Sequence, residues 1–495
     1  MAESDKDRDL RSVQQARQLA DSCRAAQRQF ASATAERVDT ICEAMADAAY
    51  CEAAHLGRMA YEETGYGDAD DKTVKNQFAA RNVWESIRNH KTVGVVRRDP
   101  SRKIIEIAEP VGVVAALTPS TNPTSTAIYK ILISVKARNG IVVSTHPSAL
   151  RCTAEAVRIM ARAAERAGAP EGLVACLEEA HLSGTQELIR HHAVSVILAT
   201  GGSPMVRAAH SVGKPAYGVG PGNVPVWVDR SADIEQAARY IVRSKAFDCS
   251  LICASEQTVV AERSIADTLR GYMEGEGAYW VSDEAAAGMR ALLFNADGSM
   301  NTKYVGKPAP ALAAALGIQV PQGTRVLVAP ITRIGPEEPL SREKLTTALG
   351  FVTVDGEERG RDACQSILKF GGDGHSAVIH SQDEAQVERM ASQLPAFRVI
   401  VNSMSTLGSV GLTCGFDPAM TLATGGIGGS ISADNITVQH LMNLKRVGWE
   451  RVPWSGAERG REVYPGRRTQ DDVEAIVAQV LARLGSGAHS SRSAA

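Results

Sequence analysis

The sequence predicts an α/β fold built on doubly wound parallel sheets, and three observations predict it. From Glu109 onward, short runs rich in valine and isoleucine alternate with longer segments of helical pattern. The chain has 495 residues, enough for roughly two to four domains, and 44% of them are hydrophobic. Its 43 glycines and an aromatic content of only 5% fit alanine-rich helices joined by glycine turns.

The part of the chain before this alternation is predicted to form helices and a hairpin. Residues from about 10 to 89 carry apolar side chains at helical spacing, for example at Val38, Ile41 and Met45. In the segment 91–108, valines and isoleucines flank a charged stretch that contains a proline, which predicts a β-hairpin with a polar tip. Because this hairpin is long, we expect it to pair with another element or with another subunit.

Two α/β units are expected to follow each other along the chain. In residues 1–230 the expected strands are 111–117, 141–144, 174–177, 194–200 and 224–228, with helices at 124–136, 149–166 and 184–192. In residues 231–425 a helix is expected at 232–245, and strands at 257–261, 325–329, 377–380 and 398–401. Residues 426–454 form a return segment, whose part 436–449 is expected to pair with the hairpin.

The end of the sequence predicts a linker followed by an amphipathic helix. Residues 455–468 are rich in glycine, arginine and proline, a composition typical of linkers. In the helix expected at 469–485, one narrow apolar stripe consists of Val473, Ile476, Val477, Val480, Leu481 and Leu484. This helix either packs on its own subunit or docks on a partner.

Charge and cysteine content exclude several classes of protein. Lysine and arginine number 54 and aspartate and glutamate 56, so the net charge of -2 indicates neither a nucleic-acid partner nor an anionic membrane. The longest apolar runs are too short to span a bilayer, and the charged start Met1–Arg8 does not resemble a signal peptide. The nine cysteines are irregularly spaced and lack a Cys-x-x-Cys pair, which predicts a reducing compartment, the cytoplasm, and no metal site.

Two residues are candidates for catalysis. Cys253 lies between a predicted helix and a predicted strand, where a loop can expose a thiolate to a substrate; the alternative is a buried structural cysteine, and Cys249 competes for the same role. Asn122 follows a strand and precedes a proline, as a turn asparagine does.

Five motifs in a fixed order resemble those of a known family. They are Glu109–Val114 (EPVGVV), Thr121–Lys130 (TNPTSTAIYK), Ile197–Gly202 (ILATGG), Gly213–Asn223 (GKPAYGVGPGN) and Ile252–Gln257 (ICASEQ). Together they resemble the aldehyde dehydrogenase superfamily in its CoA-acylating branch, from about residue 10 to residue 450. The likeness extends to the aldehyde dehydrogenase half of bifunctional alcohol/aldehyde dehydrogenases and to acylating enzymes of bacterial microcompartments.

The resemblance implies an aldehyde-dehydrogenase-like fold. Its cofactor-binding domain would be residues 1–230, its catalytic domain residues 231–425, and the hairpin at about 91–108 would be an oligomerisation arm, so a homo-oligomer is expected. The resemblance also implies that Cys253 is the nucleophile and that the Asn122 amide, with a backbone N–H group, holds the oxyanion.

The resemblance further implies which residues bind a nicotinamide dinucleotide. They are Leu117, Thr118, Pro119, Ser120, Thr121, His146, Gly202, Gly220, Glu343 and Leu422. Many relatives have lysine at the position of His146, near the adenosine ribose, and this substitution leaves NAD versus NADP unresolved; NAD is taken as the expected cofactor. Glu343 matches a glutamate that bonds the nicotinamide ribose. By spacing alone, the turn at Gly202 lacks the three-glycine dinucleotide fingerprint.

One departure from hydrolytic relatives predicts the second substrate. Those enzymes carry a water-activating glutamate where this chain has Gly218–Asn223, without a carboxylate. We therefore expect coenzyme A to take the acyl group of a small aldehyde, with a hydrolytic dehydrogenase and a non-catalytic scaffold as the alternatives. His375 matches a histidine of close relatives that could assist proton transfer from the CoA thiol, but a histidine in a glycine loop is more often structural, so it is left out of the catalytic set. Met404–Leu407 and Phe416 are expected to line the aldehyde pocket.

The helix at 469–484 resembles the encapsulation peptides of microcompartment enzymes. It predicts docking on a shell protein and a cytoplasmic location inside a bacterial microcompartment.

Overall fold

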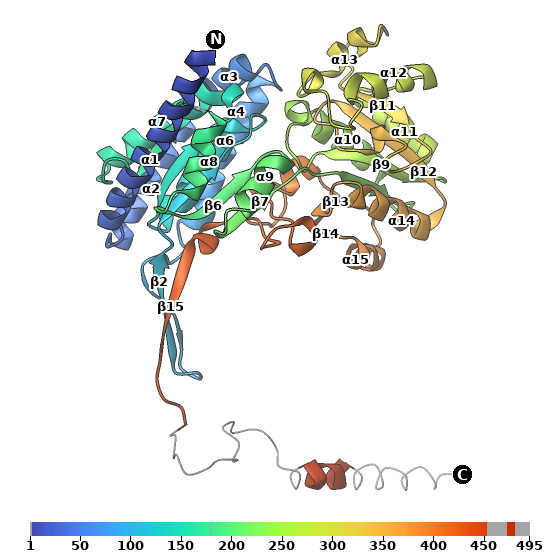
Figure 1. Cartoon of the computed structure of the whole chain (residues 1–495). Helices are drawn as coiled ribbons and strands as arrows, with labels where there is room; N and C mark the ends of the chain where they lie inside the picture. Colours follow the sequence, from blue (N-terminus) through green and yellow to red (C-terminus); the bar gives the residue numbers. More distant parts are fainter. Residues whose placement is uncertain (1, 180, 453–472, 481–495) are drawn as a thin grey trace. The chain divides into compact units, whose positions relative to one another are not determined.

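The computed structural model describes residues 2–179, 181–452 and 473–480. These residues belong to two compact units. The main unit contains residues 1–96 and 107–445, and the small unit contains residues 97–106 and the chain from 446 onward. The main unit carries two parallel sheets, each covered by helices on both faces (Figure 1).

The first sheet has five parallel strands in the order β5-β4-β3-β6-β7. Its strands are β3 (Val113–Leu117), β4 (Gly140–Ser144), β5 (Val174–Leu177), β6 (Val194–Thr200) and β7 (Ala216–Val219). Its helices are α1 (Ala2–Phe30), α2 (Ala35–Cys51), α3 (Ala53–Thr64), α4 (Ala69–Gln77), α5 (Val83–Ile87), α6 (Pro123–Lys136), α7 (Leu150–Arg166), α8 (Leu182–Arg190) and α9 (Ser203–His210). The order reverses direction beside β3, the arrangement of a doubly wound sheet.

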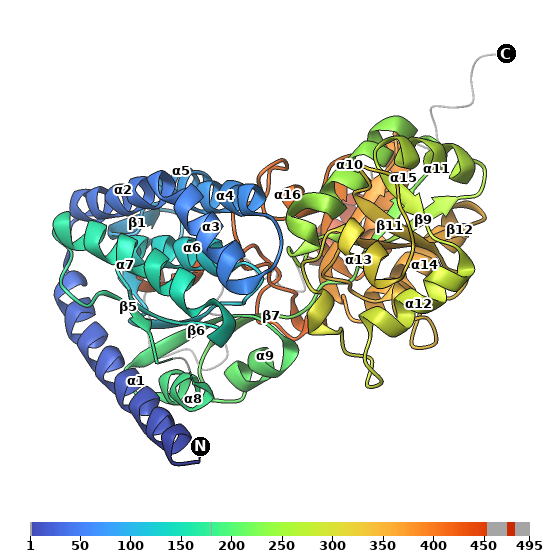
Figure 2. The ribbon, with the colours of Figure 1, turned by 90° about the horizontal axis from the view of Figure 1, so that it is seen from above.

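Alternation along the strands divides the core of this domain into two layers. Val114 and Ala116 of β3 pack with α2, α6 and α7, whereas Val113, Ala115 and Leu117 pack with α1 and α8. Figure 2 shows these two groups of helices on opposite sides of the sheet. Both faces are buried, which explains why the strands read as continuous apolar runs.

The second sheet has seven parallel strands in the order β10-β11-β12-β9-β8-β13-β14. Its strands are β8 (Val224–Val228), β9 (Glu256–Glu262), β10 (Ala278–Trp280), β11 (Val326–Pro330), β12 (Ala348–Val354), β13 (Gly374–His380) and β14 (Ala396–Val401). Its helices are α10 (Ile234–Ala246), α11 (Ala266–Gly275), α12 (Asp283–Leu293), α13 (Ala309–Ala315), α14 (Gly356–Lys369), α15 (Glu384–Gln393) and α16 (Ser405–Gly408).

The change from one sheet to the other lies earlier than the sequence predicts. The strand Val224–Val228, expected in the first unit, is β8 and pairs with β9 and β13 at the middle of the second sheet. The predicted domain boundary at residue 230 is therefore wrong, and the change lies between β7 and β8. The short strands β7 and β10, and also β12, were not expected, because glycine or aromatic residues interrupt their aliphatic pattern.

The return segment packs on the first domain before it reaches the hairpin. Ile436, Val438 and Leu441 are buried in the same core layer as α6 and α7, and the Tyr129 hydroxyl contacts the carbonyl of Ile436. The strand β15 (Met442–Gly448) then pairs with the hairpin β1 (Gly94–Asp99) and β2 (Ile104–Pro110) in the order β1-β2-β15.

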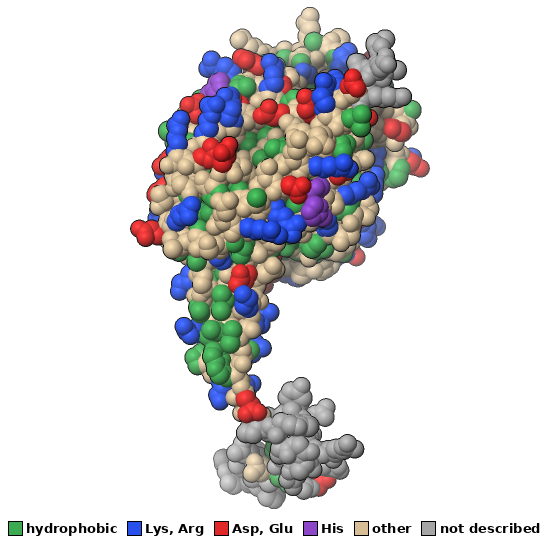
Figure 3. All heavy atoms as spheres, turned by 60° about the vertical axis from the view of Figure 1, so that its left-hand side comes forward, with side chains coloured by type: hydrophobic (Ala, Val, Ile, Leu, Met, Phe, Trp, Pro, Cys, Tyr) green, Lys and Arg blue, Asp and Glu red, His purple; other side chains and the backbone are tan. Residues whose placement is uncertain are grey.

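In this three-stranded sheet β15 is mostly exposed and β2 is mostly half-buried, and the sheet carries both charged and apolar side chains. Leu444 and Val447 of β15 are 39% and 37% exposed. Figure 3 shows hydrophobic side chains gathered along this sheet between lysines and arginines. Ion pairs join its strands, with Arg446 Nε 3.0 Å from Glu106 Oε1.

The predicted linker 455–468 lies outside the described residues. Of the predicted amphipathic helix, residues 473–480 are described and are helical, with Val473, Val477 and Val480 about half exposed; the other members of the predicted range lie outside the described residues. Among the described helices, none combines the length and the apolar character that crossing a membrane requires.

Candidate active site

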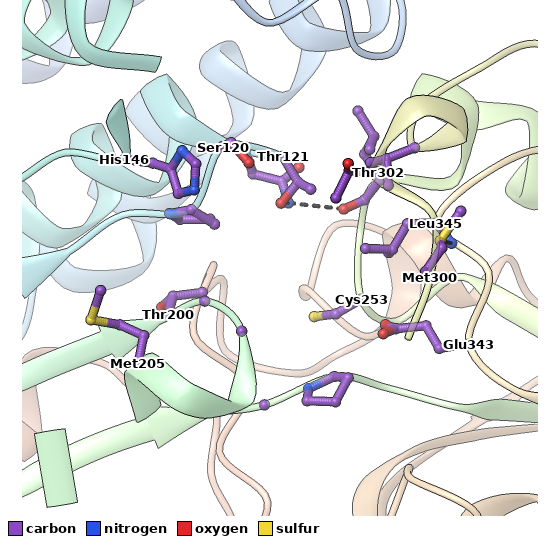
Figure 4. A pocket seen from close by; sticks show the side chains of 18 of the residues that line it. Ser120, Thr121, His146, Thr200, Met205, Cys253, Met300, Thr302, Glu343 and Leu345 are labelled. Atoms are coloured by element: carbon purple, nitrogen blue, oxygen red, sulfur yellow. Dashed lines mark hydrogen bonds between the residues drawn. The ribbon is translucent and has the colours of Figure 1, made fainter. Parts of the chain in front are cut away.

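A pocket of about 750 Å³ lies in the main unit at the carboxyl ends of the first sheet's strands (Figure 4). Residues that follow β3, β4 and β6 line one wall, and residues 294–305 and 342–345 line the other. The carboxyl edge of an open parallel sheet, at the point where the strand order reverses, is where such folds bind nucleotides. The pocket therefore has the position of a cofactor site.

Most of the predicted site residues meet in this pocket. Those that line it are Leu117, Thr118, Pro119, Ser120, Thr121, Asn122, His146, Gly202, Gly220, Cys253 and Glu343. Leu422 does not line it and is 2% exposed in the core layer of the first domain. None of Met404–Leu407 and Phe416, expected beside the aldehyde, lines this pocket.

Cys253 is presented by a tight turn ahead of β9. The turn is closed by a hydrogen bond from the N–H of Ser255 to the carbonyl of Ile252, 2.8 Å away. Figure 4 shows the Cys253 sulfur directed into the pocket, with Glu343 beside it. The competing Cys249 is buried and lines no part of the pocket, so the geometry favours Cys253 as the nucleophile.

His375, which the sequence analysis leaves out of the catalytic set, lies against the candidate nucleophile. Its Nε2 atom is 3.2 Å from Sγ of Cys253, and its Nδ1 atom is 3.1 Å from the Ser376 hydroxyl. It belongs to β13 rather than to a glycine loop, and the pairing order β9-β8-β13 brings it near the turn before β9. The strand pattern of residues 377–380 is the sequence signal that could have placed His375, because the strand extends back to Gly374.

The surroundings keep both partners uncharged. Desolvation, together with the Glu343 carboxylate, raises the pKa of the Cys253 thiol to about 12, while the Arg398 guanidinium opposes that rise. Burial, helped by the charge of Arg398, lowers the pKa of His375 to about 3. A neutral imidazole beside a thiol can accept its proton when the sulfur attacks an electrophile.

Asn122 stands at the start of α6 with both ends of its amide bonded. Its Nδ2 atom donates to the carbonyl of Leu251 at 3.0 Å and to the Thr121 hydroxyl at 3.1 Å. Its Oδ1 atom accepts from Nζ of Lys75 at 2.6 Å. Leu251 is two residues before Cys253, so the N–H side of the amide faces the nucleophile's turn. Both N–H groups are bonded here, so one of them has to leave its partner in order to donate to an oxyanion.

Glu343 is a carboxylate that lines the pocket. Its Oε1 atom accepts from the N–H of Gly222 at 2.9 Å, within the stretch where hydrolytic relatives are expected to carry their own glutamate. Burial raises the pKa of Glu343 to about 7. This residue is both the candidate ribose ligand and the carboxylate to test for water activation.

The wall after β6 and β7 is left open by two glycines. A Cβ atom at Gly202 would come no closer than 3.7 Å to another residue, and a Cβ atom at Gly220 would meet nothing within 4 Å. The protein's own packing does not demand glycine there, and the missing side chains widen the pocket. At the end of β4, His146 is exposed, its Nδ1 atom accepts from the N–H of Ser148 at 3.2 Å, and partial burial lowers its pKa.

One group of potential metal-ligating side chains occurs in the described residues, away from the pocket lining. It consists of Asp21, His191 and His192, whose ligand atoms lie within 4.8 Å of one another. The chemistry of the pocket does not involve these three residues.

The known proteins that resemble this chain are aldehyde dehydrogenases. The model of the aldehyde dehydrogenase family matches residues 8–276. Aldehyde-alcohol dehydrogenase 2 of Entamoeba histolytica is 41% identical over 85% of this chain and 50% of its own length. The chain thus spans about half the length of the curated bifunctional relatives it matches. The acetylating succinate-semialdehyde dehydrogenase of Clostridium kluyveri is 34% identical over 88% of this chain and 95% of its own length.

Solved structures show the same similarity. An acetylating aldehyde dehydrogenase from Geobacillus thermoglucosidasius has a TM-score of 0.89 and 47% identity, over 90% of this chain and 98% of its own. A propionaldehyde dehydrogenase of Rhodopseudomonas palustris, solved with CoA and an acylated cysteine, has a TM-score of 0.79 and 27% identity, over 87% of this chain and 96% of its own. The same values hold for a propionaldehyde dehydrogenase from a Clostridium phytofermentans bacterial microcompartment.

Proposed function

This chain belongs to the aldehyde dehydrogenase family, in its CoA-acylating branch, and on that premise we propose that it converts a small aldehyde and CoA into acyl-CoA. The hydride acceptor is a nicotinamide dinucleotide, and the acyl group passes through a thioester on Cys253. The observation that carries the proposal is the contact of 3.2 Å between Nε2 of the buried His375 and Sγ of Cys253, which lines the pocket together with Asn122.

In the first step, the sulfur of Cys253 bonds to the aldehyde carbon. The thiol proton passes to Nε2 of His375, and the carbonyl oxygen becomes an oxyanion. The Asn122 amide and the backbone N–H of Cys253 hold that oxyanion, which lowers the barrier because the negative charge develops within reach of fixed donors. His375 then releases the proton to solvent, because its environment disfavours the imidazolium form.

Cofactor binding falls to the wall formed by the ends of β3, β4, β6 and β7. Gly202 and Gly220 leave room there, His146 lies at the end of β4, and Glu343 lies beside Cys253. A nicotinamide dinucleotide bound along this wall supplies the acceptor for the hydride that leaves the thiohemiacetal carbon, which turns the intermediate into a thioester.

In the second step, the thiol of CoA attacks the thioester carbon. His375 accepts the CoA proton, the new carbon–sulfur bond forms, and Cys253 leaves as a thiolate that takes the proton back. The stretch Gly218–Asn223 carries no carboxylate to activate water, which favours CoA as the acceptor. The reverse reaction, acyl-CoA reduction, uses the same residues.

The decisive experiment compares products with and without CoA. Acetaldehyde and propionaldehyde are incubated with enzyme and NAD, and acyl-CoA and free acid are quantified by mass spectrometry. We expect acyl-CoA as the main product and a Cys253→Ala variant without activity. Equal amounts of free acid in both arms would favour the hydrolytic alternative, with Glu343 as the base; a Glu343→Gln variant that loses acid production would identify that base.

We propose also that the chain assembles with itself and with a microcompartment shell. The exposed Leu444 and Val447, which lie on opposite faces of β15, support a homo-oligomer, because exposed apolar side chains on an edge strand are stabilised by covering them. The described helix 473–480 exposes Val473, Val477 and Val480, as a docking helix does. Deletion of residues 460–495 is expected to preserve specific activity while a fluorescent reporter carrying 460–495 enters shells. Loss of activity on deletion, with a diffuse reporter, would contradict this role.

A further inference from the structure

Two buried lysines of α4 surround one buried carboxylate next to Asn122. The side chains of Lys72, Lys75 and Asp248 are 2%, 4% and 0% exposed. Lys72 Nζ lies 3.1 Å from Asp248 Oδ2, and Lys75 forms a shorter ion pair with the same oxygen. Lys75 donates a further hydrogen bond to Asn122 Oδ1 at 2.6 Å. The proposed mechanism makes no use of these three charged groups.

The surrounding backbone is built to hold Asp248 in place. Its Oδ1 atom accepts from the N–H of Asp68 at 2.8 Å, and its own N–H donates to Oδ2 of Asp71 at 2.7 Å. Asp248, Cys249 and Ser250 all have positive φ angles, a conformation that non-glycine residues rarely adopt. Such strain persists only where contacts fix it, so the contacts with α4 determine the path of the chain that leads to Cys253.

Burying these charges is not explained by stability. Removing ammonium and carboxylate groups from water costs several kcal/mol per ion, and packed apolar residues would serve stability at least as well. A buried cluster of charged side chains indicates a functional role when one of its members contacts a residue of the active site. Lys75 is that member, because it contacts the proposed oxyanion donor and Lys72 does not.

The contacts with Lys75 and with the carbonyl of Leu251 together determine which way the Asn122 amide points. An ammonium group can only donate hydrogen bonds, so the atom facing Lys75 has to be the amide oxygen. The amide nitrogen then faces Leu251 and the turn of Cys253. A charge-assisted bond to the oxygen also withdraws electron density from the nitrogen, which makes its N–H groups stronger donors.

We propose that Lys75 is a positioning residue for the oxyanion site, acting on the substrate through Asn122, while Asp248 holds Lys75 in place. This inference rests on the proposed function and adds to it a residue of α4, remote in sequence from all five motifs. Burial lowers the pKa of Lys75 to about 8, with the Asp248 carboxylate opposing the shift, so the side chain is largely an ammonium at neutral pH.

The test compares Lys75→Met with Lys72→Met. Both variants remove a buried ammonium that pairs with Asp248, but only the first removes the hydrogen bond to Asn122. We expect Lys75→Met to lower kcat by about tenfold to thirtyfold with the aldehyde KM changed by less than about threefold. Lys72→Met is expected to change kcat by no more than about threefold. A Lys75→Gln variant, which keeps a neutral donor, should fall between wild type and Lys75→Met and covers the case in which Lys75→Met does not fold.

A double-mutant cycle separates positioning from a general structural role. If Lys75 acts through Asn122, then Lys75→Met should have almost no further effect on kcat in an Asn122→Ala background. Equal losses in the two lysine variants, or a full additional loss in the Asn122→Ala background, would overturn the inference while the wild type stays active. A wild type without CoA-dependent activity would overturn the proposed function, and the inference with it.

Discussion

His375 Nε2 lies 3.2 Å from Cys253 Sγ, and the surroundings hold the two side chains as imidazole and thiol rather than as an ion pair. Cysteine enzymes that keep a thiolate–imidazolium pair react with electrophiles at all times. Here the pKa of the thiol is about 12 and that of the histidine about 3, so proton transfer accompanies attack on the substrate. The free enzyme is therefore expected to be weakly reactive.

This expectation predicts the pH dependence of alkylation. Only the thiolate reacts, so inactivation of the free enzyme by iodoacetamide should accelerate about tenfold per pH unit from about pH 7 to about pH 10, without a plateau. Mass spectrometry of the peptide with Cys253 separates this reaction from modification of the exposed Cys51. A plateau below about pH 8 would mean a preformed thiolate and would contradict the neutral pair.

Removal of the Asn122 amide should slow the first chemical step. Asn122→Ala is expected to lower kcat by about a hundredfold to a thousandfold, because one donor of the oxyanion site is lost. Asn122→Asp keeps an oxygen for Lys75 and loses the N–H groups, so it should be equally impaired. Pre-steady-state measurement of reduced nicotinamide gives the rate. If Asn122→Asp retains most of the activity, the N–H groups do not bind the oxyanion.

His146 should determine the choice between the two nicotinamide dinucleotides. Its pKa lies below the ordinary value, so at neutral pH it is uncharged and offers no cation to a 2′-phosphate. Substitution His146→Lys should raise the ratio of kcat/KM for NADP over NAD by about tenfold. The exposed His192, which does not line the pocket, provides a control as His192→Lys. An unchanged ratio in His146→Lys would place the 2′-hydroxyl elsewhere.

Two glycines near α4 test the contribution of Asp248 to stability. At Gly67 a Cβ would lie 1.9 Å from Asp248 Oδ1, whereas at Gly65, also at positive φ, the nearest other atom is 3.9 Å away. Gly67→Ala should lower the free energy of unfolding by about 2–4 kcal/mol and also kcat, because the buried carboxylate must move. Gly65→Ala should cost about 1 kcal/mol, from backbone strain alone. Denaturant titration and steady-state kinetics measure both; equal losses would contradict the role of Asp248.

The sequence predicted the parts of the fold whose pattern is local. Strands such as Val194–Thr200 and Val224–Val228 match their predicted bounds, since burial on both faces produces uninterrupted aliphatic runs. The assignment of Val224–Val228 to the first sheet was wrong because strand pairing is not local. The sequence of a strand does not indicate which neighbouring strand it pairs with.

The residues of the candidate site also fall into two groups, those that local motifs predict and those whose role depends on tertiary contacts. Cys253, Asn122 and Glu343 came from motifs, and they line one pocket. The sequence does not show the contact of His375 with Cys253, because that contact depends on β13 lying beside β8, a long-range pairing. Lys75 was missed for another reason. In the polar helix Ala69–Gln77 it reads as a solvated charge, and only the tertiary packing of α4 shows it buried.

The return of the chain after the second sheet determines the order in which the two domains can be completed. Ile436, Val438 and Leu441 fill the core of the first domain, yet a ribosome adds them after every strand of the second sheet. During synthesis the domain that begins second can therefore finish first. Until these residues are synthesised, part of the apolar core of the first domain is exposed. The helices near the amino terminus are therefore the segment of the nascent chain that most needs protection.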